Sequence, residues 1–130
     1  MTVLVGYVPS ALGRAALRAA VQQARFRNEP VLVVNTSRGD AYVDPRLAAE
    51  DELTRVVREL TAEGVPHTVR QLVRGRDAAE EIAEIADTEE VSLVVIGIRH
   101  RTPVGKLIMG STAQEILLRV SCPVLAVKAD

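Results

Sequence analysis

The stretch VSLVVIGIRHRTPVGKLIMGST, residues Val91 to Thr112, decides the fold and contains the first candidate site. Its unbroken apolar run, Leu93 to Ile96, is typical of a buried β-strand and ends at Gly97. A basic, glycine-punctuated loop follows, and Gly110-Ser111-Thr112 then opens an amphipathic helical segment. Backbone N–H groups at a helix start lack intrahelical partners, and the helix dipole favours negative charge there. This order of strand, loop and helix predicts an anion site, with a phosphate-bearing ligand as the first candidate.

The charges of this stretch agree with an anion site. No aspartate or glutamate occurs between Glu90 and Glu115, while Arg99, Arg101 and Lys106 all do. The residue after Lys106 is neither serine nor threonine, and the GxxxxGK spacing is absent, so the loop is not a P-loop.

The rest of the chain alternates between short apolar runs and longer amphipathic stretches. Strands that consist of continuous Val, Ile and Leu are buried on both faces, which is typical of a parallel sheet covered by helices. The sequence therefore predicts an α/β fold: a doubly wound, five-stranded parallel sheet in a Rossmann-like three-layer α/β/α sandwich, as a single domain over residues 1–130. The expected strands are Val3–Val5, Val31–Val34, Val69–Val73, Leu93–Ile96 and Val124–Val127, and the expected helices are Ala15–Phe26, Pro45–Ala62, Ala78–Ala86 and Ser111–Val120.

The expected topology places a ligand at one end of the sheet. In open α/β sheets, ligands bind beyond the carboxyl ends of the strands, where the strand order reverses. If the first and fourth strands are central neighbours, the loops at that point run from Tyr7 to Leu12 and from Gly97 to Gly110. The second loop is long for a βα connection, typically about 2–6 residues, and long loops in compact domains are usually functional.

Composition excludes several classes of protein. A hydrophobic share of 48 % excludes a disordered chain, and the apolar runs are too short for a membrane span of about 20 residues. A net charge of −1 and an aromatic share of 2 % argue against nucleic-acid binding. The lone cysteine, Cys122, has no disulfide partner and is expected to be a packing residue. The N-terminus shows no signal peptide, so a cytoplasmic location is expected.

The spacing from Gly97 to Gly110-Ser111 resembles the nucleotide loop of universal stress protein domains, which carry Gly-x2-Gly-x9-Gly-(Ser/Thr). The resemblance covers the whole chain: an opening strand that leads to Ser10, the βαβ order, and the ending Cys122 to Val127. It implies a small cytoplasmic protein that binds ATP or a related adenine nucleotide in a regulatory role. In the ATP-binding members the loop and the Gly-(Ser/Thr) turn hold the phosphates, and Gly97, Gly110 and Ser111 match these positions.

The candidate nucleotide-binding residues come from three places in the chain. They are Val8, Pro9 and Ser10 after the first strand, Val34 in the second, and Gly97, Arg99, His100, Arg101, Gly105, Lys106, Gly110, Ser111 and Thr112 at and after the fourth. No catalytic residue and no metal ligand is expected, and a role for Mg²⁺ stays open.

Two positions depart from the family pattern and motivate an alternative. His100 stands at the second glycine of the motif, where a side chain restricts the approach of the backbone to a phosphate. Val8 stands at the family's acidic position after the first strand, and valine can neither accept a hydrogen bond from a ribose nor help to hold Mg²⁺. The alternative function is a dimeric interaction module that is independent of nucleotide.

Two further classes fit the sequence less well. A slow ATPase needs a metal and a positioned water, and the sequence places no acidic residue at the switch point. A response-regulator receiver needs an acidic cluster after the first strand and an aspartate after the third, where this chain has Tyr7-Val8-Pro9 and Arg74-Gly75-Arg76.

The chain ending predicts an oligomeric state. Pro123 to Val127 is a short, hydrophobic strand near the C-terminus, and bare sheet edges of this kind tend to be paired or covered. It also resembles the family's closing strand, which commonly pairs with its counterpart in a dimer. We therefore expect a homodimer through Pro123–Val127.

Overall fold

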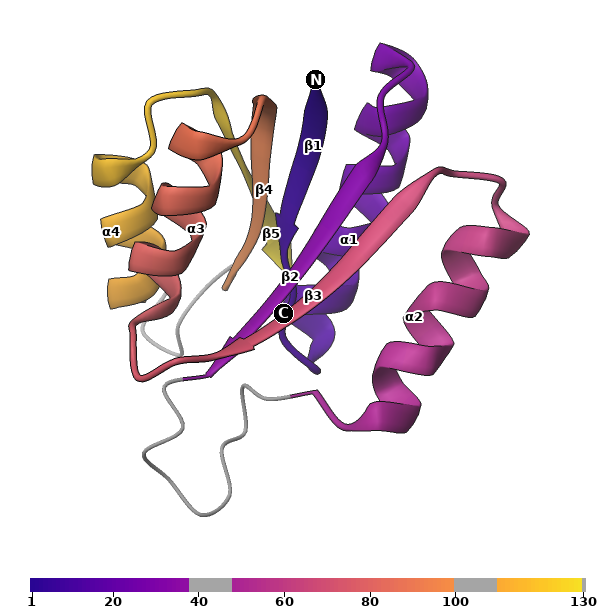
Figure 1. Cartoon of the computed structure of the whole chain (residues 1–130), viewed down its shortest axis with the longest axis horizontal. Coiled ribbons are helices and arrows are strands. Elements are labelled where there is room, and N and C mark those ends of the chain that lie inside the picture. Colours follow the sequence, from indigo (N-terminus) through magenta and orange to yellow (C-terminus); the bar gives the residue numbers. More distant parts are fainter. Residues whose placement is uncertain (38–47, 100–109, 130) are drawn as a thin grey trace.

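The computed structural model describes residues 1–37, 48–99 and 110–129, and its strands and helices alternate along the chain (Figure 1). The strands are β1 (Thr2–Gly6), β2 (Val31–Ser37), β3 (His67–Val73), β4 (Val91–Arg99) and β5 (Val124–Ala129). The helices are α1 (Ala11–Arg27), α2 (Glu50–Ala62), α3 (Ala78–Thr88) and α4 (Ser111–Arg119). Each predicted element is present, with bounds that differ by several residues at some ends.

The five strands form one parallel sheet in the order β3-β2-β1-β4-β5. β2 lies on one side of β1 and β4 on the other, so the order of the strands reverses between β1 and β4. This confirms that the first and fourth strands are central neighbours, and it places the switch point at the carboxyl ends of these strands, which end at Gly6 and Arg99.

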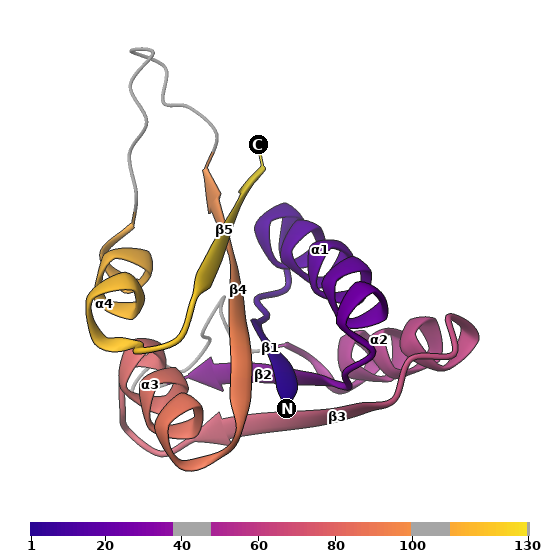
Figure 2. The ribbon, with the colours of Figure 1, turned by 90° about the horizontal axis from the view of Figure 1, so that it is seen from above.

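The helices form two layers, with α1 and α2 on one face of the sheet and α3 and α4 on the other (Figure 2). Alternate side chains of the central strands pack on these two layers. Val3, Val5 and Val95 belong to the cluster that includes α1 and α2. Leu4 and Ile96 belong to the cluster that includes α3 and α4. The strands are therefore buried on both faces, and the predicted three-layer α/β/α sandwich is confirmed.

Two strands continue beyond the apolar runs that predict them. β2 extends through Asn35 to Ser37, all of them buried, because these polar residues pair with β3 in register. β4 continues through Gly97 to Arg99, because these residues pair with β5. The expectation that the loop after the fourth strand begins at Gly97 is therefore wrong.

The helix starts also differ from the prediction. α1 begins at Ala11, four residues before the predicted start, and α2 begins at Glu50 instead of Pro45. Residues 45–47 of the predicted second helix lie outside the described part of the chain. Within the described residues, no helix is both long and apolar enough to cross a membrane.

Two glycines allow the first turn of α1 to press against its neighbours. A Cβ added at Gly13 would lie 1.8 Å from the carbonyl oxygen of Val8, and one added at Gly97 would lie 2.3 Å from the carbonyl oxygen of Leu12. Both distances are far below van der Waals contact, and the opposing atoms belong to the backbone. Only glycine fits at these two positions unless the backbone moves.

Replacement of Gly13 by alanine is expected to lower the free energy of unfolding by about 1–3 kcal/mol, because the added methyl overlaps the Val8 carbonyl. The loss should occur although alanine favours a helix over glycine by about 1 kcal/mol. Gly110→Ala is the matched control: its Cβ meets no atom of the described residues within 4 Å, so it should lose no more than about 1 kcal/mol, the cost of alanine at a helix N-cap. Urea unfolding measures both; a Gly13→Ala variant as stable as the parent would contradict the packing described.

Candidate functional site

A cavity of about 650 Å³ opens at the carboxyl ends of β1 and β4, at the switch point of the sheet. Strands β1, β2 and β4 and the first turns of three helices contribute to its wall. The described lining residues are Gly6, Tyr7, Val8, Ser10, Leu12, Gly13, Val34, Thr36, Ala78, Ile82, Ile96, Gly97, Ile98, Arg99, Gly110, Ser111, Thr112, Ala113 and Ile116.

The N-termini of three helices face this cavity. α1 contributes Leu12 and Gly13, α3 contributes Ala78, and α4 contributes Ser111 and Thr112. Parallel strands followed by helices place every helix start at the carboxyl edge of the sheet, so this convergence follows from the topology. First-turn N–H groups have no intrahelical acceptor, and each dipole carries partial positive charge at this end. The backbone thus makes the cavity attractive to an anion.

The residue that precedes α4 leaves this end of the cavity open. Gly110 is the N-cap of α4, in extended backbone conformation (φ −65°), and it has no side chain with which to cap the helix. A Cβ at Gly110 would meet no atom of the described residues within 4 Å. Within this part of the chain, nothing covers the first turn of α4 on the side of Gly110.

The side chains that line the cavity reinforce this electrostatic character. Arg99 is the only charged residue among the described residues that line it. Ile82, Ile96 and Ile116 supply an apolar surface, on which a charged hydrogen bond is less screened than in water. A ligand with an apolar portion and an anionic group fits this combination.

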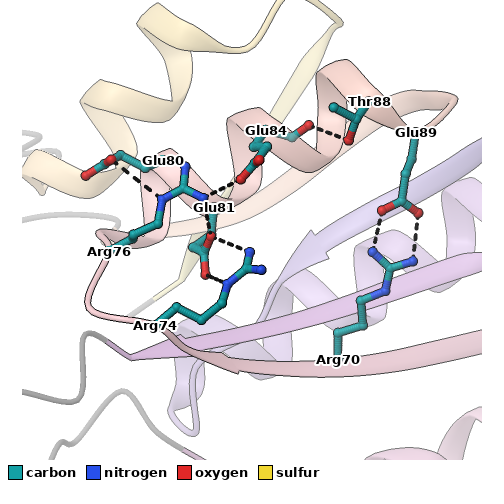
Figure 3. Close-up of polar contacts among 8 residues, drawn as sticks. All are labelled: Arg70, Arg74, Arg76, Glu80, Glu81, Glu84, Thr88 and Glu89. Atoms are coloured by element: carbon teal, nitrogen blue, oxygen red, sulfur yellow. Dashed lines mark hydrogen bonds and ion pairs between the residues drawn. The ribbon is translucent and has the colours of Figure 1, made fainter.

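Arginines neutralise the carboxylates at the start of α3, beside the cavity (Figure 3). Glu81 is 1 % exposed, and Arg74 donates to its two oxygens from Nε and Nη2 at 2.9 and 2.7 Å. Arg76 Nη1 lies 3.0 Å from Glu81 Oε1 and also donates to Glu84, which lowers the pKa of that carboxyl. Glu80, Glu81 and Glu84 are therefore in ion pairs with the arginines of the preceding turn, which offset their negative charge beside the cavity.

Tyr7 forms part of the cavity wall and ties it to α2. Its backbone N–H donates to Val34 O at 2.9 Å, and its carbonyl accepts from Asn35 Nδ2 at 2.9 Å. Its hydroxyl donates to Glu52 Oε1. Burial and then the hydrogen bond to Glu52 raise the pKa of Tyr7 to about 12, so the hydroxyl remains a donor throughout the physiological range.

The structure brings together most of the predicted site residues that it describes. Val8, Ser10, Val34, Gly97, Arg99, Gly110, Ser111 and Thr112 all line the cavity. Pro9 does not, although its neighbours do. His100, Arg101, Gly105 and Lys106 lie outside the described residues.

Two predicted residues have other structural settings than expected. Arg99 was assigned to a loop, but it is the last residue of β4, paired with Ala129. Gly97, which matches the first glycine of the family's nucleotide loop, faces the backbone of Leu12 as well as the cavity. Packing against Leu12 is therefore enough to require glycine at this position.

Sequence reasoning missed Tyr7, Thr36, Ala78 and Ile82 as lining residues. Tyr7 and Thr36 follow apolar runs at the carboxyl ends of β1 and β2, a position that does signal the site. Ala78 and Ile82 enter because α3 lies against the switch point, which no local pattern shows. Among the described residues, no group of three or more His, Cys, Asp or Glu could hold a metal ion.

Comparison with known proteins agrees with this arrangement. The model of the universal stress protein family matches residues 1–128. The chain belongs to this family. A universal stress protein of Mycolicibacterium smegmatis is 48 % identical over 126 residues, which cover 97 % of this chain and 96 % of the relative.

Solved universal stress protein structures share the fold. One from Archaeoglobus fulgidus has a TM-score of 0.84 and 34 % identity, with 98 % of both chains covered. A second structure from the same organism, in complex with dAMP, has a TM-score of 0.77 and 28 % identity, again with 98 % of both chains covered.

The raised pKa of Tyr7 predicts how the stability of this universal stress protein changes in alkali. An unfolded tyrosine ionises near pH 10 but folded Tyr7 only near 12, so the stabilisation is complete below pH 10 and is lost as the pH rises to 12. Between pH 9 and 11.5 the parent should lose about 1–2 kcal/mol more unfolding free energy than Tyr7→Phe. Denaturant unfolding at pH 9 and 11.5 measures the difference; equal losses in the two proteins would contradict it.

Proposed function

We propose that this universal stress protein binds ATP or a related adenine nucleotide in the cavity between β1 and β4, in a regulatory role in the stress response. One observation carries the proposal: three helix N-termini and Arg99 face one cavity whose described lining contains no carboxylate. Such a site favours a phosphate through backbone N–H groups and a guanidinium.

The shape of the cavity supports a ligand of nucleotide size. Its volume of about 650 Å³ lies within the usual range of small-molecule pockets, about 300–1,000 Å³. We place the phosphate at Gly110, Ser111 and Thr112, and the base against the apolar side chains Val8 and Val34. The Archaeoglobus fulgidus relative in complex with dAMP supports an adenine nucleotide as the ligand class.

Val8 distinguishes this cavity from one that needs a metal. Valine offers no ligand to Mg²⁺ and no acceptor to a ribose hydroxyl, and the remaining described lining residues provide no carboxylate. The phosphate contacts therefore carry more of the affinity. We infer that Mg²⁺ is not required, and that the protein is a binding protein without catalytic activity.

Gly110→Asp and Gly110→Asn form a matched pair that tests the phosphate position. Neither side chain meets an atom of the described residues near its Cβ, and the backbone at 110 suits any residue, so both variants should fold. The aspartate places a negative charge at the start of α4, and we expect it to weaken dAMP and ATP binding at least about tenfold relative to asparagine. Isothermal titration calorimetry measures the affinities.

Equal nucleotide affinity in the two variants would show that the phosphate does not bind at the start of α4. An absence of binding in the parent itself would favour the alternative, a nucleotide-independent interaction module, for which Val8 is the observation. Thermal unfolding with millimolar ATP, ADP, AMP and cyclic AMP distinguishes these cases, because a micromolar ligand raises the melting temperature through RT ln(1 + [L]/Kd).

We further propose a cytoplasmic homodimer that pairs through Pro123–Val127. β5 lies at one edge of the sheet, beside β4, and Val124 to Val127 are each only half-buried. An edge strand with unpaired backbone groups and apolar side chains suits pairing with a second copy.

Replacement of Val124 or Val127 by lysine tests this interface. The charge should yield monomers, because it would be buried unpaired between two copies. Multi-angle light scattering measures the mass, and circular dichroism confirms that the variant is folded. A folded variant that remains dimeric would place the interface elsewhere.

A further inference from the structure

A second, smaller cavity of about 200 Å³ lies beside Tyr7. It is lined by Tyr7, Arg14, Leu17, Arg18, Arg55, Val56 and Glu59. These residues come from the end of β1 and from α1 and α2, the helices of one face of the sheet. Tyr7 lines both cavities, but α3 and α4 contribute nothing to the smaller one.

Helical spacing gathers the charged side chains at this cavity. Arg14 and Arg18 are four residues apart on α1, and Arg55 and Glu59 are four residues apart on α2, so each pair lies on one face of its helix. Three guanidinium groups and one carboxylate therefore line the same small space.

A neighbouring glutamate neutralises only part of this positive charge. Glu52 Oε2 lies 2.5 Å from Arg55 Nη2, while its Oε1 accepts from the Tyr7 hydroxyl. Arg14 Nη1 is 4.0 Å from Glu52, at the limit of an ion pair. Arg18 makes no ion pair with any residue in the described ranges. Glu52 is thus bonded to Tyr7 and Arg55. The guanidinium of Arg18 and most N–H donors of Arg14 remain available to bind a ligand.

We propose that this cavity binds a small phosphate anion, of the size of inorganic phosphate or pyrophosphate. A guanidinium offers a planar fork of donors that matches phosphate oxygens, and a tetrahedral phosphate can accept from several guanidiniums at once. Leu17 and Val56 are buried and form the apolar part of the wall, while the charged side chains are exposed and open to an ion from solvent. The volume is under a third of that of the nucleotide cavity, so the site takes the phosphate without a nucleoside. The proposal does not depend on nucleotide binding.

The test is calorimetric titration of the full chain with inorganic phosphate at low ionic strength. Arg18→Gln should weaken binding about fivefold or more, because it removes the uncommitted guanidinium. Arg58→Gln is the matched control: Arg58 is an exposed arginine of α2 outside the cavity, and its loss should change the affinity less than about twofold. Equal losses in the two variants would reduce the effect to overall charge and overturn the proposal.

A reciprocal variant and a second site control complete the experiment. Glu59→Gln should strengthen phosphate binding about twofold or more, because it removes a carboxylate from the wall. Gly110→Asp should weaken only phosphate binding to the nucleotide cavity, so the part of the binding that Arg18→Gln removes should persist in it. Phosphate binding that is lost in Gly110→Asp but kept in Arg18→Gln would place the anion in the nucleotide cavity. Equally strong binding of acetate would show a general anion surface; either result overturns the proposal.

Discussion

The backbone of α1 meets its neighbours without intervening side chains at two places, and the position of the cavity at the switch point depends on this contact. Gly13 lies against Val8, and Gly97 lies against Leu12. These contacts bring the start of α1 close to the turn after β1 and to the end of β4, the two strands between which the sheet reverses its order. A side chain at either glycine would push the helix away and separate its N-terminus from that of α4.

The electrostatics of the cavity follow from the same arrangement. Three helix starts face it, and their dipoles favour negative charge whatever their side chains are. The carboxylates that begin α3 are matched by Arg74 and Arg76, so the positive end of the helix is not cancelled from the side. Two side-chain features, Arg99 and the absence of a side chain at Gly110, then distinguish the end of the cavity at which we place a phosphate.

Much of the fold could be predicted from the sequence because its signals are local. Runs such as Leu93 to Ile96 identify buried parallel strands, and their alternation with amphipathic stretches identifies the layers. Strand ends were less predictable: Asn35 is polar yet buried, because its side chain bonds the Tyr7 carbonyl, the Ala48 N–H and Gln71. These partners lie far apart in the sequence, so no local pattern indicates them.

The candidate site, too, has one part that the sequence indicates and one part that it does not. The end at which we place a phosphate, Gly110-Ser111-Thr112, carries a sequence motif, and the structure places these residues in the cavity wall. The opposite wall carries no sequence motif. Ala78 and Ile82 line the cavity because α3 packs beside α4, and in the sequence they look like any other small or apolar helix residues. The sequence also does not indicate that Gly97 packs against Leu12, because a glycine required by a motif and a glycine required by packing cannot be told apart in a sequence.

The most direct test of the central claim is a titration of ¹⁵N-labelled protein with dAMP, followed by amide chemical shifts. We predict that the largest shifts fall on the first turns of α1 and α4, at Leu12 and Gly13 and at Ser111 to Ala113, because these N–H groups face the cavity. Saturable shifts confined to another part of the chain, or none at millimolar dAMP, would contradict a nucleotide site built from converging helix N-termini.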